Sequence, residues 1–183
     1  MGRKTLSIMK FSKEEKKFWQ THYHFDKPSQ LHENWQQIWS VDGNEDDDFF
    51  YFFTKRLITI QDVYLKDTLI TDKAVAYMVQ FKELKSLFLR RHDTITKACI
   101  PFINQMQQLE SLNITKTKIT LTDLCDSLNN QSLKEVFLDA EEDEKGILEK
   151  AFMLKERMPN CDVFLNCSSS IDAFGNKEKP IFS

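Results

Sequence analysis

The chain has few of the residues that interrupt, cross-link or anchor a polypeptide. Glycine and proline each occur four times among 183 residues, which excludes collagen-like and linker-rich architectures. No apolar run approaches the roughly 20 residues that a membrane helix needs, and no two cysteines form a C-x-x-C pair. The net charge of −3 gives no strong overall attraction to nucleic acid or to acidic membranes. We therefore expect neither nucleic acid nor membrane as a partner.

Apolar residues make up 41% of the chain and aromatic residues 12%, which is enough for one sizeable core. The apolar stretch within the first ten residues is too short for a signal peptide, and Leu6 stands where N-myristoylation needs Ser or Thr. Reduced, buried thiols are expected at Cys99, Cys125, Cys161 and Cys167. These features favour a cytoplasmic protein of one domain.

Apolar residues recur in one register through the middle of the chain. The pattern apolar-x-x-apolar-x-apolar starts at Ile60, Leu84, Leu109, Leu133 and, in a weaker copy, Met158. The starts step by 24 or 25 residues, and a fixed period of this length is the signature of a repeat architecture. Each copy predicts a short strand with its apolar side chains in one core, and the strands are expected to stack as a parallel sheet.

A threonine that follows an isoleucine comes after each of the first three strands. A side-chain oxygen at such a place can accept hydrogen bonds from the free N–H groups of a helix start. The proline at position 101 predicts a short or displaced first turn in the second of the helices that follow. The expected helix caps are Thr71 or Asp72, then Thr96, then Thr122 or Asp123.

This sequence pattern, L-x-x-L-x-L followed by T-x-I-T, resembles that of the leucine-rich repeat family. It looks most like the repeats of roughly 24–26 residues in F-box-associated proteins, bacterial leucine-rich repeat proteins and mitochondrial ATP synthase coupling factor B. The resemblance implies an α/β solenoid of about five strand–helix units, with a parallel sheet on the inner, concave face and helices outside. The chain departs from the family's consensus where that consensus places Asn or Cys, because it has Thr68, His92, Thr117 and Glu141 there.

The two ends do not carry the repeat, which occupies residues 56–167. Residues 1–55 are expected to form a mainly helical, aromatic N-terminal cap, because solenoids expose core at both ends. Ser12 and Glu15 have the spacing of a capping box and predict a helix over about residues 13–23. Residues 168–183 lack periodicity and are expected to be a flexible tail.

A second amphipathic helix is predicted within the cap, because several apolar residues share one helical face. These residues are Leu31, Trp35, Ile38 and Trp39. The core that the first repeat exposes is expected to be covered by the side chains of Trp35, Trp39 and Phe50–Phe53.

No calcium-binding or catalytic motif is complete. Asp42, Asn44 and Asp46 have the first spacings of an EF-hand loop, but Asp47 and Phe53 stand where Gly and Glu are required. The chain has no G-x-S-x-G sequence, no Gly-rich phosphate loop and no local cysteine signature. We therefore predict no enzymatic activity, no cofactor and no metal.

The histidine-rich N-terminal segment provides the alternative from another class, a metal-dependent enzyme. His22, His24 and His32 are candidates for a metal cluster, although no carboxylate or cysteine joins them at a recognised spacing. Their aromatic neighbours favour packing within the cap.

The x positions of the strand pattern form the one surface left for recognition. Side chains alternate along a strand, so these positions face solvent on the concave side. Exposed aromatic residues aligned on a rigid sheet are typical of interface centres. The predicted central row is Tyr64, Phe88, Asn113, Phe137 and Asp162, and the other candidate partner-binding residues are Lys66, Arg90, Thr115, Glu135 and Asp139.

Charge also separates along the repeats. Residues 56–116 carry nine Lys and Arg against six Asp and Glu, whereas residues 117–150 carry four against nine. A surface that runs from basic to acidic orients a partner with the reverse pattern. We predict a non-catalytic protein–protein interaction module, an adaptor or scaffold, present as a monomer or in a heterocomplex.

Two further roles stay open, the first narrower within this class and the second a rival to it. One is a stoichiometric inhibitor, such as a bacterial immunity protein, whose acidic flank covers the basic active site of a toxin or enzyme. The other is a structural subunit of a larger assembly, as the resemblance to coupling factor B implies. The first 20 residues include Glu14 and Glu15 and few serines, so they do not look like a mitochondrial presequence.

Overall fold

Six strands form one open, all-parallel sheet. The computed structural model describes residues 10–31, 35–56, 59–140, 146–167, 169–171 and 176–182. The strand order is β1-β2-β3-β4-β5-β6, so chain order and spatial order coincide. The strands are β1 (Gln37–Val41), β2 (Asp62–Lys66), β3 (Ser86–Arg90), β4 (Ser111–Asn113), β5 (Glu135–Leu138) and β6 (Asp162–Leu165).

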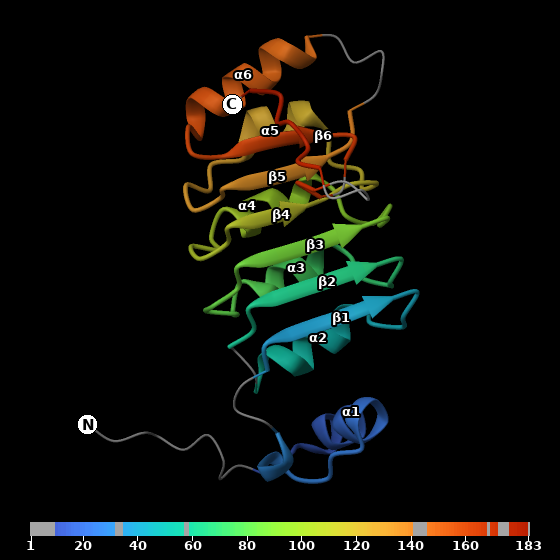
Figure 1. Cartoon of the computed structure of the whole chain (residues 1–183). Coiled ribbons are helices and arrows are strands. Elements are labelled where there is room, and N and C mark those ends of the chain that lie inside the picture. Colours follow the sequence, from blue (N-terminus) through green and yellow to red (C-terminus); the bar gives the residue numbers. More distant parts are fainter. Residues whose placement is uncertain are drawn as a thin grey trace, which may run out of the picture.

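From β1 onward, helices alternate with the strands and lie behind one face of the sheet, whereas α1 (Lys13–Tyr23) lies beyond the β1 end (Figure 1). The other helices are α2 (Asp47–Thr54), α3 (Asp72–Met78), α4 (Ile100–Ile103), α5 (Leu121–Ser127) and α6 (Ile147–Arg157), with short 3-10 turns η2 (Pro28–Gln30) and η3 (Lys97–Cys99). The opposite face carries no helix within the described ranges, and we call it the open face. None of the described helices combines the length and the apolar character needed to cross a bilayer.

The strand register follows the spacing of the apolar residues. Val63, Leu87, Leu112 and Val136 are partners on adjacent strands. All four side chains are fully buried between the sheet and the helices. The prediction that apolar positions 24 or 25 residues apart align on neighbouring parallel strands is therefore confirmed for β2 to β5.

The weaker fifth copy lies two residues away from its predicted register. Val136 pairs with Val163 and Phe137 pairs with Phe164, whereas the sequence pattern placed Asp162 opposite Phe137. A slip of two residues keeps every side chain on its predicted face, because the side-chain period of a strand is two. It removes Asp162 from the central row, so that part of the prediction is wrong.

Threonines begin the helices at two of the three predicted places. Thr71 caps α3 and Thr96 caps η3. Helix α5 begins instead after Thr120, whose hydroxyl accepts the Asp123 N–H while the Asp123 carboxylate accepts the Thr120 N–H. The proline in the second predicted helix leaves only the 3-10 turn η3 and the short helix α4.

The N-terminal cap is partly as predicted. Helix α1 has its capping box at Ser12 and Glu15, which confirms that prediction. The second predicted helix is wrong, because residues 37–41 form the edge strand β1, paired with β2. Trp35 packs on Phe53 with ring centroids 5.2 Å apart, but Trp39 is 66% exposed on the open face and does not cover the core.

The C-terminal residues contact the last strand and helix. The Ile181 N–H donates to the Val163 carbonyl at 2.9 Å. The Phe182 ring lies edge-on to the Phe152 ring of α6, with centroids 6.0 Å apart. Residues 176–182 are thus held on the protein, unlike the loose tail that the missing periodicity suggested.

A buried Thr68–His92 pair joins the turns that follow β2 and β3. The Thr68 N–H donates to Nε2 of His92 at 3.1 Å, which requires a neutral ring with its proton on Nδ1. The backbone of His92 forms an isolated parallel β-bridge with that of Thr117 in the turn after β4. Glu141 lies outside the described residues. Burial lowers the pKa of His92, partly offset by the Leu89 carbonyl and Asp67.

We expect mild acidification to weaken the fold through His92. Its pKa is lower in the folded chain than the unfolded value of about 6.5, so the unfolded chain takes up the proton first. The contribution of His92 is full above that value and is lost as the pH falls through it toward the folded pKa. Urea unfolding between about pH 7 and pH 5 should show a smaller loss of stability for His92→Asn than for the wild type. The exposed residue His24, changed to Asn, is the control. Equal slopes for the wild type and His92→Asn would contradict this role.

Candidate functional site

The side chains of the open face form rows that run across the strands. The row at the strand starts is Gln37, Asp62, Ser86, Ser111, Glu135 and Asp162. The middle row is Trp39, Tyr64, Phe88, Asn113, Phe137 and Phe164. Toward the strand ends, Val41, Lys66 and Arg90 lie side by side.

The first three aromatic residues of the middle row form an accessible stack. The rings of Trp39 and Tyr64 are 4.4 Å apart at an interplanar angle of 17°, and those of Tyr64 and Phe88 are 5.6 Å apart at 30°. Trp39 is 66% exposed, and the other two rings are half-buried. Three strands of a hydrogen-bonded sheet hold these rings, so the stack is a rigid apolar strip.

Trp39 was missed by the sequence analysis, which placed it in a helix. The signal was present, because Trp35-x-x-Ile38 precedes Ile60-x-x-Val63 by the same 25-residue step. Spacings of three and four residues fit a helix equally well, so the local pattern hid the long-range one.

The other half of the middle row is closed. Phe137 is 1% exposed, Asn113 is fully buried, and Thr115 is 2% exposed. The Phe137 ring stacks on Phe164 at 4.8 Å, and the side-chain Oδ1 of Asn113 accepts hydrogen bonds from the Thr115 N–H and hydroxyl. The prediction that Asn113, Thr115 and Phe137 face solvent is therefore wrong.

The C-terminal chain covers this half of the open face. Figure 1 shows it crossing in front of the strands at the β6 end of the sheet. The Glu178 N–H donates to the Ser170 carbonyl, and Ile171 bridges Lys177, so the segment doubles back on itself. Burial, with the charges of Glu178 and Asp139, raises the pKa of the Cys167 thiol. The accessible part of the open face is thus the β1–β3 half.

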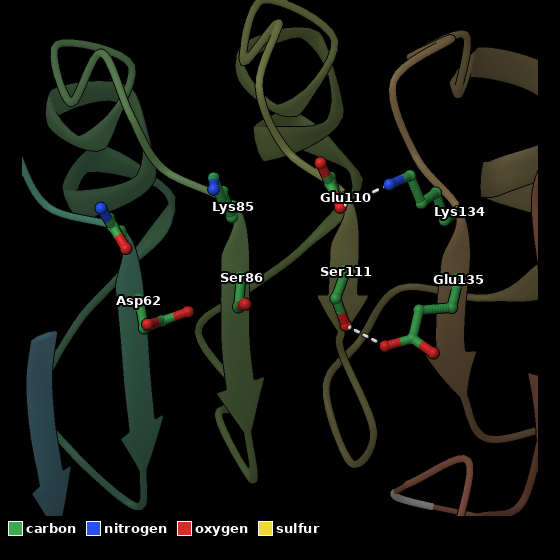
Figure 2. A pocket seen from close by; sticks show the side chains of 8 residues that line it. Asp62, Lys85, Ser86, Glu110, Ser111, Lys134 and Glu135 are labelled. Atoms are coloured by element: carbon green, nitrogen blue, oxygen red, sulfur yellow. Dashed lines mark hydrogen bonds and ion pairs between the residues drawn. The ribbon is translucent and has the colours of Figure 1, made fainter. Parts of the chain in front are cut away.

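A polar groove of about 370 Å³ follows the starts of β2 to β5 (Figure 2). In it, Lys134 and Glu110 form an ion pair at 2.7 Å, and the Ser111 hydroxyl donates to Glu135 at 2.7 Å. The Asp62 carboxylate points toward Ser86 in Figure 2. A smaller hollow of about 170 Å³ runs from there along the aromatic stack, with Asp62 and Ser86 in both linings. The polar groove at the strand starts and the hollow along the aromatic stack are therefore continuous.

Cationic side chains line the opposite flank of the stack. Lys66 and Arg90 are half-buried neighbours on β2 and β3. Arg90 follows Phe88 by two residues on the same strand and face, and its Nε donates to the Thr115 hydroxyl at 3.1 Å. The aromatic strip thus lies between the carboxylate of Asp62 and two cations.

The remaining predicted site residues lie away from the stack. Asp162 belongs to the strand-start row, where its carboxylate pairs with Lys155 at 2.9 Å. Asp139 is exposed and accepts the Lys116 N–H at 2.6 Å. Of the predicted set, the structure brings together Tyr64, Lys66, Phe88 and Arg90, and leaves Glu135 in the polar groove.

The described residues do not support the alternative hypothesis of a metal-dependent enzyme. There, no three His, Cys, Asp or Glu side chains are gathered as a metal site. His22 lies against the rings of Phe18 and Phe49, whereas His32 falls outside the described residues. Burial raises the pKa of Cys161 to about 12 and that of Cys99 further, so these free thiols stay protonated and poorly nucleophilic.

Comparisons with known proteins found no relative for this chain among protein-family models and curated proteins.

Proposed function

We propose that the chain is a leucine-rich repeat solenoid that acts in the cytoplasm as a non-catalytic protein-binding module. The 24- and 25-residue register across β2 to β5 supports the repeat. So does a left-handed residue one place after β1, β2, β3 and β6, with φ of 54° at Asp42, 53° at Asp67, 60° at Arg91 and 58° at Asn166. A turn of similar geometry that recurs after most of the strands is expected of stacked, similar units.

The accessible aromatic stack carries the functional proposal. Trp39, Tyr64 and Phe88 present a strip of aromatic surface that no described segment covers. Large aromatic residues flanked by charge are the usual centre of a protein interface, where they supply most of the affinity. The strands are already ordered, which lowers the entropic cost of binding. We propose a partner protein with an apolar centre, a cation opposite Asp62 and carboxylates opposite Lys66 and Arg90.

Truncation of the stack should remove partner binding and spare the fold. We expect Phe88→Ala and Arg90→Glu each to reduce capture of the partner from the native host, as measured by quantitative mass spectrometry. A hot-spot loss of about 2 kcal/mol corresponds to roughly thirtyfold weaker binding. The matched control is Leu148→Ala, which removes an exposed apolar side chain from helix α6. Equal capture by the wild type and Phe88→Ala would contradict the proposed site.

A stoichiometric inhibitor is the second candidate, because two acidic side chains lie at the two ends of β5. Glu135 lines the polar groove, and Asp139 is exposed at the end of β5. An inhibitor is expected to hold its target at nanomolar or tighter affinity, whereas an adaptor often binds in the micromolar range. Titration calorimetry with the captured partner separates the two roles.

A further inference from the structure

The two edges of the sheet differ in how they end. At the β6 edge, the chain's own Ile181 N–H donates to the Val163 carbonyl at 2.9 Å. At the other edge, β1 pairs with β2 alone, and no described segment pairs with its outer side. An unpaired strand edge is a ready template for another strand.

The backbone groups that face outward on β1 can be assigned from its inner bonds. The Gln36 carbonyl accepts the Asp62 N–H, and the Asp42 N–H donates to the Lys66 carbonyl, so the even-numbered residues face β2. Successive residues of a strand alternate in direction. The N–H and C=O groups of Gln37, Trp39 and Val41 therefore point away from the sheet. Their side chains are also exposed, at 66% for Trp39 and 40% for Val41.

Strand β1 lacks the features that normally protect an edge. Its sequence, Gln37-Ile-Trp-Ser-Val41, has no charge and no proline, and it keeps an unbroken register with β2. Helix α1 does not protect it, because α1 packs on α2. Phe18 contacts Phe49 and Phe52 with ring centroids 5.5 and 5.3 Å apart.

We infer that β1 is a self-association site, and that its occupant is β1 of a second copy. Antiparallel pairing about a two-fold axis at Trp39 sets Trp39 opposite Trp39 and Gln37 opposite Val41. All three outward residues then form hydrogen-bonded pairs, each exchanging two bonds. A two-fold interface must be self-complementary, and this uncharged strand opposes no like charges. The aromatic stacks of the two copies would continue across the junction. This inference does not depend on the proposed partner, and it replaces the monomer expected from the sequence.

Sedimentation equilibrium of the full chain over micromolar to millimolar concentrations tests the inference. We expect a monomer–dimer equilibrium that Val41→Pro weakens at least about tenfold, because proline removes an outward N–H and no bond to β2. Val41→Thr, which keeps the N–H, should dimerise nearly as the wild type does. A wild type that stays monomeric would overturn the inference. So would a dimer that Val41→Pro leaves intact, or one that Val41→Thr abolishes equally.

Two further measurements keep the test decisive if Val41→Pro fails to fold. Trp39→Lys places two like charges opposite each other in the pairing and should also give a monomer. Hydrogen exchange should show the Trp39 and Val41 amides protected at dimer concentrations and unprotected in the monomer. Protection that persists in the monomer would mean that the chain's own residues cover the edge, which would also overturn the inference.

Discussion

Truncating Phe137 to alanine is expected to lower the free energy of unfolding by about 3–5 kcal/mol, the usual cost of deleting a buried phenylalanine ring. The ring is 1% exposed and stacks on Phe164 at 4.8 Å, although it points to the open face of the sheet. Its loss leaves a cavity beside the Phe164 ring on β6. Chemical denaturation followed by circular dichroism measures the change.

The matched control is Trp39→Ala, which lies in the same row at the opposite edge of the sheet, on β1. Trp39 is larger but 66% exposed, so its truncation should cost no more than about 1 kcal/mol. The two variants thus separate a covered aromatic residue from an accessible one in a single experiment. A loss for Phe137→Ala as small as that for Trp39→Ala would show that the C-terminal chain does not cover β5.

The substitution Arg56→Met, which removes the charge of this side chain, is expected to lower the free energy of unfolding by about 3 kcal/mol. Its guanidinium binds the Glu15 carboxylate through two bonds, at 2.7 and 3.0 Å, and joins α1 to the end of α2. The two side chains are 12% and 8% exposed, so the substitution leaves a carboxylate buried without its counter-ion. Thermal unfolding with a urea series gives the free-energy difference.

The pH dependence distinguishes this ion pair from simple packing. Burial alone raises the pKa of Glu15, but the hydrogen bonds and charge of Arg56, with the Ser12 N–H, outweigh it and hold that pKa below its usual value. The stability from Glu15 is therefore present above the unfolded pKa of about 4.3 and lost as the pH falls through the folded pKa. In Arg56→Met the buried carboxylate prefers its protonated form, so the deficit relative to wild type should shrink from about pH 7 to pH 4.

A double variant and an exposed control complete this experiment. Glu15→Gln combined with Arg56→Met removes the unpaired charge and should recover part of the lost stability. Lys16→Met breaks only an exposed contact to Asp26 at 4.0 Å and should change stability by less than about 0.5 kcal/mol. A pH-independent deficit in Arg56→Met would contradict the role of the pair.

The sheet could be predicted from the sequence because its signal is redundant. Leu87, Leu112 and Val136 each belong to a six-residue pattern that recurs at a nearly constant step, and one shared core enforces that step. The slip at β6 has a local cause. Val163 fits the pattern in either of two registers, and only pairing with Val136 selects one.

The accessible site could be predicted only in part, because access depends on segments without periodicity. Tyr64 and Phe88 follow from strand alternation alone. Phe137 obeys the same rule, yet its ring is buried against Phe164, and strand alternation does not indicate that burial in advance. Because Phe137 is buried, the candidate interface lies closer to β1 than the sequence predicted.

Site-specific photo-crosslinking in the native host tests the proposed interface most directly. The crosslinker p-benzoylphenylalanine would replace Tyr64 in the aromatic stack or, in a separate variant, Leu148 on helix α6. We predict that residue 64 gives a covalent adduct with one partner protein and that residue 148 gives none with it. An adduct from residue 148 without one from residue 64 would contradict binding at the open face.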